Sequence, residues 1–173
     1  FTDDDELALK LKMIASHGQS KRYYHDMVGC NSRLDSMQAA ILDIKLKHLD
    51  EYCGARKKAA DFYDAAFAGN GKITVPFRAA NQKHVFHQYT LRITNGKRDQ
   101  LMEHLQAKQI PCAIYYPIPL HSQKAYVDSR YKEEDFPVTN QLVKEVISLP
   151  MHTELDDEQI KFITDSVLEF FAK

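Results

Sequence analysis

The sequence predicts an α/β protein in which an all-helical first part is followed by a part that alternates strands and helices. Three observations support this prediction. Apolar residues at helical spacing fill residues 4–17 and 33–68, a period-two alternation starts at residue 85, and helical patterns return after it. The first part has no strands to cover its apolar helices, so we expect it to belong to a larger sheet-containing domain.

Composition places the chain among ordinary folded proteins. It has 173 residues, of which 44% are hydrophobic and 27% charged, which excludes a disordered chain and a disulfide-dense scaffold. The formal net charge of -1 predicts no general attraction to nucleic acid or to an anionic membrane. Because the chain begins at Phe1, within a few residues of a predicted helix, we expect it to be a fragment.

The cysteines and the hydropathy pattern indicate a cytoplasmic protein. Cys30, Cys53 and Cys112 are odd in number and widely spaced, so neither a disulfide framework nor a zinc cluster is predicted. No stretch approaches the ~20 apolar residues of a membrane-spanning helix. We therefore expect no membrane partner.

The first part is predicted to contain two helical stretches joined by a functional loop. A helix over residues 4–17 ends at Gly18, and residues 19–31 read as a loop rich in Tyr, His, Lys and Arg. Residues 33–68 contain no proline and are apolar on more than one face, which is typical of a buried helix. A bend is predicted near residues 50–54.

The second part is predicted to begin with a β-α-β run. Its expected elements are a strand over residues 85–94, a helix over 97–108, a strand over 112–116, a helix over 138–146 and a short strand over 147–150. Asp156 and Gln159 have the spacing of a capping box, which predicts the start of the last helix.

Known catalytic and metal-binding motifs are not found. The eight histidines form no His-Glu-x-x-His pattern, and the sequence contains neither a Gly-x-Ser-x-Gly elbow nor a phosphate-binding glycine loop. We therefore assign no catalytic residue and no metal ligand within this chain.

Two clusters remain as candidate binding sites. Gly29 to Arg33 presents an amide, a hydroxyl and a guanidinium that suit phosphate or carboxylate, although Asn31 or Ser32 could instead cap a helix. Tyr115 and Tyr116 enter a proline-stiffened loop that suits a ligand wall, or they pack on the core as a strand end. The residues alone leave both alternatives open.

Five segments in register resemble the DegT/DnrJ/StrS family of pyridoxal-phosphate-dependent nucleotide-sugar aminotransferases. They are His17-Gly18-Gln19 with Tyr23-x-His25, Gly29-x-Asn31-Ser32-Arg33-Leu34-Asp35 with Gln38-Ala39-Ala40, His87-Gln88-Tyr89, Tyr116-Pro117-Ile118-Pro119-Leu120-His121, and Ser148-Leu149-Pro150-Met151-His152.

The resemblance implies the C-terminal half of a type I aminotransferase fold. Residues 1–53 would be the helical tail of the large cofactor-binding domain, and residues 54–173 would be the small C-terminal α/β domain, with Gly54 at the bend between them. The family's Schiff-base lysine lies upstream of the segment that resembles residues 2–8. No lysine here matches it, so the chain alone is expected to be inactive.

The resemblance also implies roles for four residues. Asn31 would bind the phosphate of pyridoxal phosphate held by the partner subunit of a homodimer, and Arg33 would lie near the anionic part of a nucleotide sugar. Tyr115 and Tyr116 would line the sugar pocket, although many relatives have histidine where Tyr115 stands.

The implied function is transfer of an amino group, with glutamate as donor, to a nucleotide-diphosphate-linked keto-sugar for polysaccharide biosynthesis. The pattern from His17 to Asp35 resembles members that act on 3-keto sugars. Two alternatives remain. One is a non-catalytic β-α-β regulatory or binding module with a helical dimerisation arm, and the other is a sensor-type relative of the same fold.

Overall fold

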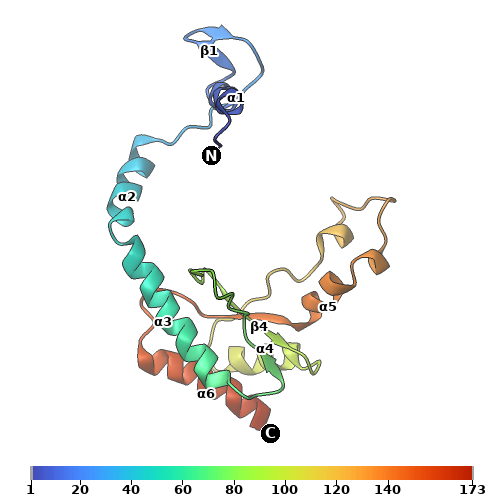
Figure 1. Cartoon of the computed structure of the whole chain (residues 1–173). Coiled ribbons are helices and arrows are strands. Elements are labelled where there is room, and N and C mark those ends of the chain that lie inside the picture. The colour runs from blue at the N-terminus through green and yellow to red at the C-terminus, as the bar shows by residue number, and fades with distance from the viewer. Residues whose placement is uncertain (1, 173) are drawn as a thin grey trace. The chain divides into compact units, whose positions relative to one another are not determined.

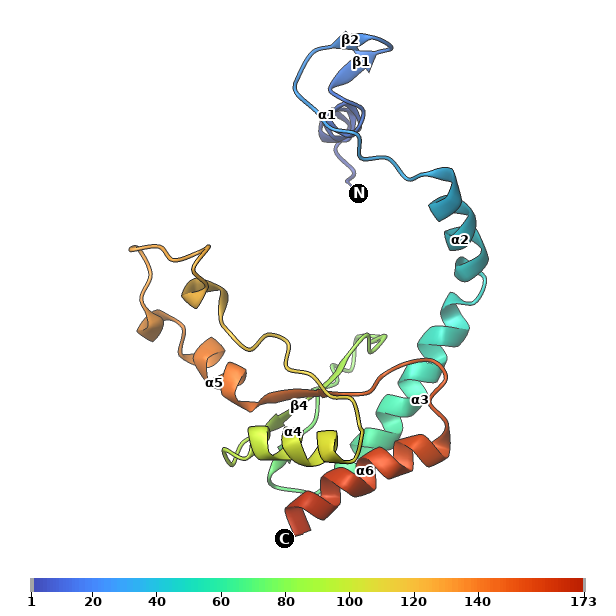
Figure 2. The ribbon, with the colours of Figure 1, turned by 180° about the vertical axis from the view of Figure 1, so that it is seen from behind.

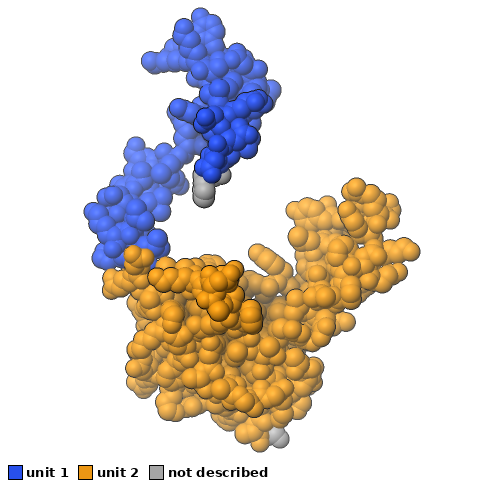
Figure 3. All heavy atoms as spheres, in the orientation of Figure 1, with its two compact units in different colours: residues 1–49 blue, residues 50–173 orange. Residues whose placement is uncertain are grey.

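The computed structural model describes residues 2–172 (Figure 1). The chain divides into two compact units, one up to Leu49 and one from Asp50 onward (Figure 3). Each unit is described by itself. Within the described residues, no helix is long and apolar enough to cross a membrane.

The first unit contains two helices and a short antiparallel hairpin. The Asp4 carboxylate accepts a hydrogen bond from the Leu7 amide at 3.0 Å, which caps the first helix. The segment 19–31, predicted to be a loop, contains this hairpin. Its strands were not predicted because they are too short and too polar to show an alternation of apolar and polar residues. The elements are α1 (Asp5–Ala15), β1 (Gln19–Lys21), β2 (Tyr24–His25) and α2 (Ser36–Leu46).

The bend predicted near residues 50–54 lies elsewhere. Helix α2 ends in a tight turn in which the His48 amide donates to the Lys45 carbonyl at 3.0 Å, and helix α3 (Leu49–Phe67) runs uninterrupted through Gly54. A Cβ atom on Gly54 would meet nothing within 4 Å, so this glycine serves no turn or close approach. The division into domains at residues 53 and 54 stays a prediction about the longer fold.

The second unit is built on an antiparallel sheet with the order β3-β4-β5. Tyr89, Leu91 and Ile93 of β4 are fully buried while Thr90 and Arg92 are half-buried, which confirms the predicted alternation over residues 89–93. The strand predicted from residue 85 begins only at Tyr89, and before it the prediction is wrong, because Val85 is exposed and Phe86 is buried. The strands are β3 (Ile73–Thr74), β4 (Tyr89–Ile93) and β5 (Val146–Leu149). Strand β3 was not predicted, because a strand of two residues is too short to show an alternation of apolar and polar residues.

The strand predicted over residues 112–116 is reduced to a single bridge. Ala113 pairs with Ser148 of β5 through two backbone hydrogen bonds of 2.8 and 3.2 Å. Pro111 and Pro117 flank this segment and prevent a longer ladder. Because β5 is antiparallel to both β4 and the Ala113 segment, these two run parallel with β5 between them. The two strands of the predicted β-α-β run are therefore parallel but not adjacent, because β5 lies between them.

Three long helices close the core of the second unit. Both ribbon views place α3, α4 and α6 on one side of the sheet (Figure 2), and their apolar side chains form one cluster with the strands. The predicted capping box is confirmed, because Gln159 and Asp156 exchange hydrogen bonds of 2.7 and 3.2 Å. The remaining elements are α4 (Arg98–Ala107), η1 (Leu120–Ser122), η2 (Glu133–Asp135), α5 (Pro137–Glu145) and α6 (Asp157–Ala172).

Candidate functional site

In the first unit, Asn31 and Arg33 form a pair of exposed hydrogen-bond donors. Arg33 Nε donates to Asn31 Oδ1 at 3.0 Å, which orients the Asn31 amide. Among the residues that the structure describes, Asn31 Nδ2 and the terminal guanidinium nitrogens of Arg33 have no partner. An outward amide beside a guanidinium suits a phosphate or carboxylate oxygen, so these residues fit an anionic ligand.

The alternative in which Asn31 or Ser32 caps a helix is wrong. Asp35 caps α2, because its carboxylate accepts a hydrogen bond from the Gln38 amide at 2.9 Å. Asn31 instead forms an isolated bridge with Ser16. Its side chain is therefore available for a ligand.

The backbone that carries Asn31 is tied to the end of α1. Cys30 and Ser32 donate their amides to the Ile14 and Ala15 carbonyls at 2.8 and 2.9 Å. Gly29 permits this approach, because a Cβ atom there would lie 2.3 Å from the Gly18 nitrogen. Residue 31 is thus held on both sides by main-chain contacts.

Gly29→Ala should destabilise this unit by about 1–3 kcal/mol, because the added methyl group overlaps backbone atoms that cannot move aside. Hydrogen exchange of the Cys30 and Ser32 amides measures the effect. Gly54→Ala is the matched control, since it adds a methyl group in open space inside a helix and should stabilise by ~0.5–1 kcal/mol. Equal exchange rates in the two variants would contradict the packing argument.

In the second unit, Tyr115 and Tyr116 border a cavity of about 600 Å³ between the proline-rich loop and α5. Their ring centroids lie 6.4 Å apart in an edge-on arrangement, and the two residues are 49% and 78% exposed. The alternative in which they pack on the core is therefore wrong. The cavity, called here the tyrosine cavity, is lined by Tyr115, Tyr116, Ile118, Pro119, Leu120, Gln123, Thr139, Leu142, Val143 and Val146.

A second cavity of about 300 Å³ also uses Tyr115. It gathers residues from two of the segments that carried the resemblance, among them His87, Gln88, Ser148 and His152. The sequence did not single these out as site residues, because the histidines lie far apart in the chain and lack ligand spacing. The pairing of Ser148 with both Thr90 and Ala113 brings these segments together.

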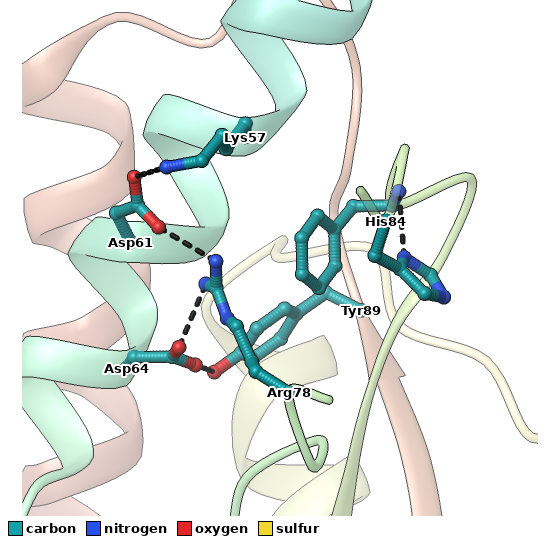
Figure 4. A network of polar contacts seen from close by, with 7 residues as sticks. Lys57, Asp61, Asp64, Arg78, His84 and Tyr89 are labelled. Carbon is teal, nitrogen blue, oxygen red and sulfur yellow. Dashed lines mark hydrogen bonds and ion pairs between the residues drawn. The ribbon is translucent and has the colours of Figure 1, made fainter. Parts of the chain in front are cut away.

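A polar network holds the segment before β4 against α3 (Figure 4). Tyr89 Oη donates to Asp64 Oδ1 at 2.5 Å, and Arg78 bridges Asp64 and Asp61 with contacts of 2.7 Å to each. A hydrogen bond from Lys57, together with Arg78, lowers the pKa of Asp61, while burial raises the pKa of Tyr89. The network fixes the start of β4, close in the chain to residue 87.

Within residues 2–172, no group of three or more His, Cys, Asp or Glu side chains is placed to hold a metal ion. The donors of Asn31 and Arg33 suit an anion, and the cavity beside the tyrosines suits a largely apolar group.

Fold and side chains together define an α/β chain with an exposed pair of anion-complementary donors in one unit and a tyrosine-lined cavity in the other. The model of the DegT/DnrJ/EryC1/StrS aminotransferase family matches residues 1–168. The chain belongs to this family, so the resemblance and the α/β fold class are confirmed.

Similar proteins and a solved structure agree with this assignment. The chain is 45% identical over 163 residues to a UDP-2-acetamido-2-deoxy-3-oxo-D-glucuronate aminotransferase of Pseudomonas aeruginosa, covering 94% of this chain and 44% of that protein. It is 42% identical over 173 residues to a pleiotropic regulatory protein of Geobacillus stearothermophilus, covering 99% and 46%. The crystal structure of DesV from Streptomyces venezuelae superposes with a TM-score of 0.93 at 37% identity, covering 99% and 46%. The chain thus spans about half the length of these relatives.

Proposed function

We propose that this chain is part of a pyridoxal-phosphate-dependent enzyme that transfers an amino group from glutamate to a nucleotide-linked keto-sugar. The observation that carries the proposal is the family match over residues 1–168. The names of two relatives point to carbon 3 of the sugar, since one is a 3-oxo-glucuronate aminotransferase and another a dTDP-3-amino-3,4,6-trideoxy-α-D-glucose transaminase. We therefore propose a 3-keto sugar as the amino acceptor.

The chain's own residues would bind and orient the reactants. Asn31 donates its free amide hydrogens to the cofactor phosphate of the partner subunit in a homodimer, and Arg33 binds the anionic diphosphate of the sugar nucleotide. Tyr115 and Tyr116 supply a flat wall and two hydroxyl groups for the sugar. Pyridoxal phosphate, when bound, supplies the group that carries nitrogen from donor to acceptor.

The lysine that binds the cofactor would lie outside residues 1–173. Several lysines of this chain are engaged in exposed ion pairs on helix surfaces, such as Lys10 with Glu6 at 2.6 Å and Lys161 with Asp165 at 2.5 Å. None of the residues lining the tyrosine cavity is a lysine. We therefore propose that the 173-residue chain alone is inactive.

A borohydride experiment tests this proposal. The 173-residue chain, incubated with pyridoxal phosphate and reduced, should give no stoichiometric adduct at a single lysine, whereas the full-length enzyme should give one adduct outside residues 1–173. Peptide mapping by mass spectrometry locates the label. A stoichiometric adduct at one defined lysine within residues 1–173 would contradict the proposal.

A regulator without transaminase activity is the second candidate. It is favoured by the name of the Geobacillus stearothermophilus relative, a pleiotropic regulatory protein at 42% identity. The two candidates differ in one observable property. A full-length protein that stays colourless and binds no pyridoxal phosphate would favour the regulator.

A further inference from the structure

Helix α5 forms a wall of the tyrosine cavity, yet none of its residues is buried. Leu142 and Val143 of this helix, and Val146 directly after it, face the cavity but are only half-buried. Apolar packing therefore contributes less to holding α5 than it does to α3, α4 and α6, which each bury core residues. The position of this wall must depend on other contacts.

Arg98 provides the first of these contacts. Its side chain extends from the first turn of α4, and Nη1 donates to the carbonyls of Val143 and Val146 at 3.0 and 2.9 Å. Both carbonyls lie at the C-terminal end of α5, where helix carbonyls lack partners within the helix. A cation at this end is also favoured by the helix dipole. Arg98 is 9% exposed, so water does not readily replace it.

An ion pair from β4 holds the same end. Arg92 donates from Nε and Nη2 to Glu145 Oε2 at 3.0 and 2.8 Å, and Gln141 donates to the other carboxylate oxygen at 2.9 Å. The Glu145 side chain is 13% exposed. Hydrogen bonds from Gln141 and Arg92 lower the pKa of Glu145, so the pair stays ionised near neutral pH.

We propose that Arg98 is a positioning residue that sets the width of the tyrosine cavity. It acts through Val143 and Val146, whose side chains line the cavity while their carbonyls bind the guanidinium. The Arg92 and Glu145 pair supports the same wall from the sheet. This inference rests on the proposed function, in which the tyrosine cavity receives the sugar.

The kinetic test compares Arg98→Gln with Arg98→Lys and with Arg130→Gln. Arg130 is the matched control, because its guanidinium also forms a short contact, to Asp128 at 2.7 Å, but on an exposed surface, and it does not line the cavity. In the full-length enzyme, Arg98→Gln should raise KM for the keto-sugar roughly ten-fold and leave the glutamate half-reaction within about two-fold. Arg98→Lys should recover part of the loss, and Arg130→Gln should change neither quantity.

The structural test uses the 173-residue chain and does not depend on activity. In methyl NMR spectra, Arg98→Gln should shift and broaden the resonances of Leu142, Val143 and Val146, while those of Ile163 and Val167 in α6 stay in place. If Arg98→Gln fails to fold, Arg98→Lys takes its place, with smaller shifts expected in the same resonances.

The outcomes separate the two proposals. A wild-type enzyme that does not accept an amino group from glutamate overturns the proposed function, while the methyl spectra still decide the positioning role. Unchanged α5 methyl resonances in Arg98→Gln overturn the positioning role. An equal loss in both half-reactions also overturns it, because Arg98 would then support the fold as a whole.

Discussion

Arg33→Ala should slow the sugar half-reaction of the full-length enzyme by roughly ten-fold to a hundred-fold, as expected for a lost charge-assisted contact of ~1.5–3 kcal/mol. With pyridoxal phosphate in excess, so that loss of the hydrogen bond to Asn31 does not empty the site, the conversion of the cofactor by glutamate should stay near normal, because the proposed contact is with the sugar nucleotide. The two half-reactions are followed separately through cofactor absorbance. Arg33 is exposed and hydrogen-bonded only to Asn31 among the described residues, so its loss should leave the fold intact.

Tyr116→Phe removes one hydroxyl group and retains the ring. Since Tyr116 is 78% exposed beside the cavity, this change should also affect the sugar half-reaction alone, by less than Arg33→Ala. Arg130→Ala serves as the control for both variants. If the rate of the glutamate half-reaction falls as much as that of the sugar half-reaction, these residues stabilise the fold or bind the cofactor. Their assignment to the sugar would then be wrong.

Asn31→Ala should weaken cofactor retention, because an amide hydrogen bond to a charged phosphate contributes ~1.5–3 kcal/mol. The main-chain ties of Cys30 and Ser32 to α1 do not involve the side chain, so the backbone at residue 31 should be retained. Equilibrium dialysis of the full-length enzyme against pyridoxal phosphate measures the loss.

A subunit-mixing experiment tests the proposal that Asn31 binds the cofactor phosphate of the partner subunit in a homodimer. Mixing Asn31→Ala subunits with subunits that lack the Schiff-base lysine places both lesions at one site of each heterodimer and leaves the other site whole. Activity should partly return on mixing. An inactive mixture, in a sample shown to exchange subunits, would argue that Asn31 acts within its own subunit.

Elements governed by local chemistry were predictable from the sequence. The capping box of Asp156 and Gln159 and the alternation through β4 both depend on residues close together in the chain, and both are confirmed. The bend was misplaced because Gly54 was read as a helix break. In the structure Gly54 lies inside α3, and no close contact there requires a glycine. The end of α2 at Leu46 is marked by neither glycine nor proline.

The proximity of candidate site residues was predictable where these residues are close together in the sequence. Asn31 with Arg33, and Tyr115 with Tyr116, were recognised as clusters, and the structure retains both. The second cavity was missed because strand pairing alone brings His87 and His152 to one place. The anchoring of α5 by Arg98 was missed for the same reason, since the guanidinium reaches carbonyls 45 and 48 residues away.

The absorbance spectrum of the full-length protein tests the central claim most directly. The purified protein should carry pyridoxal phosphate, glutamate should convert the bound cofactor to its amino form, and a nucleotide-linked 3-keto sugar should restore the starting spectrum. A protein whose amino-form cofactor is returned by no keto-sugar nucleotide, or a protein that binds no cofactor, would contradict the account.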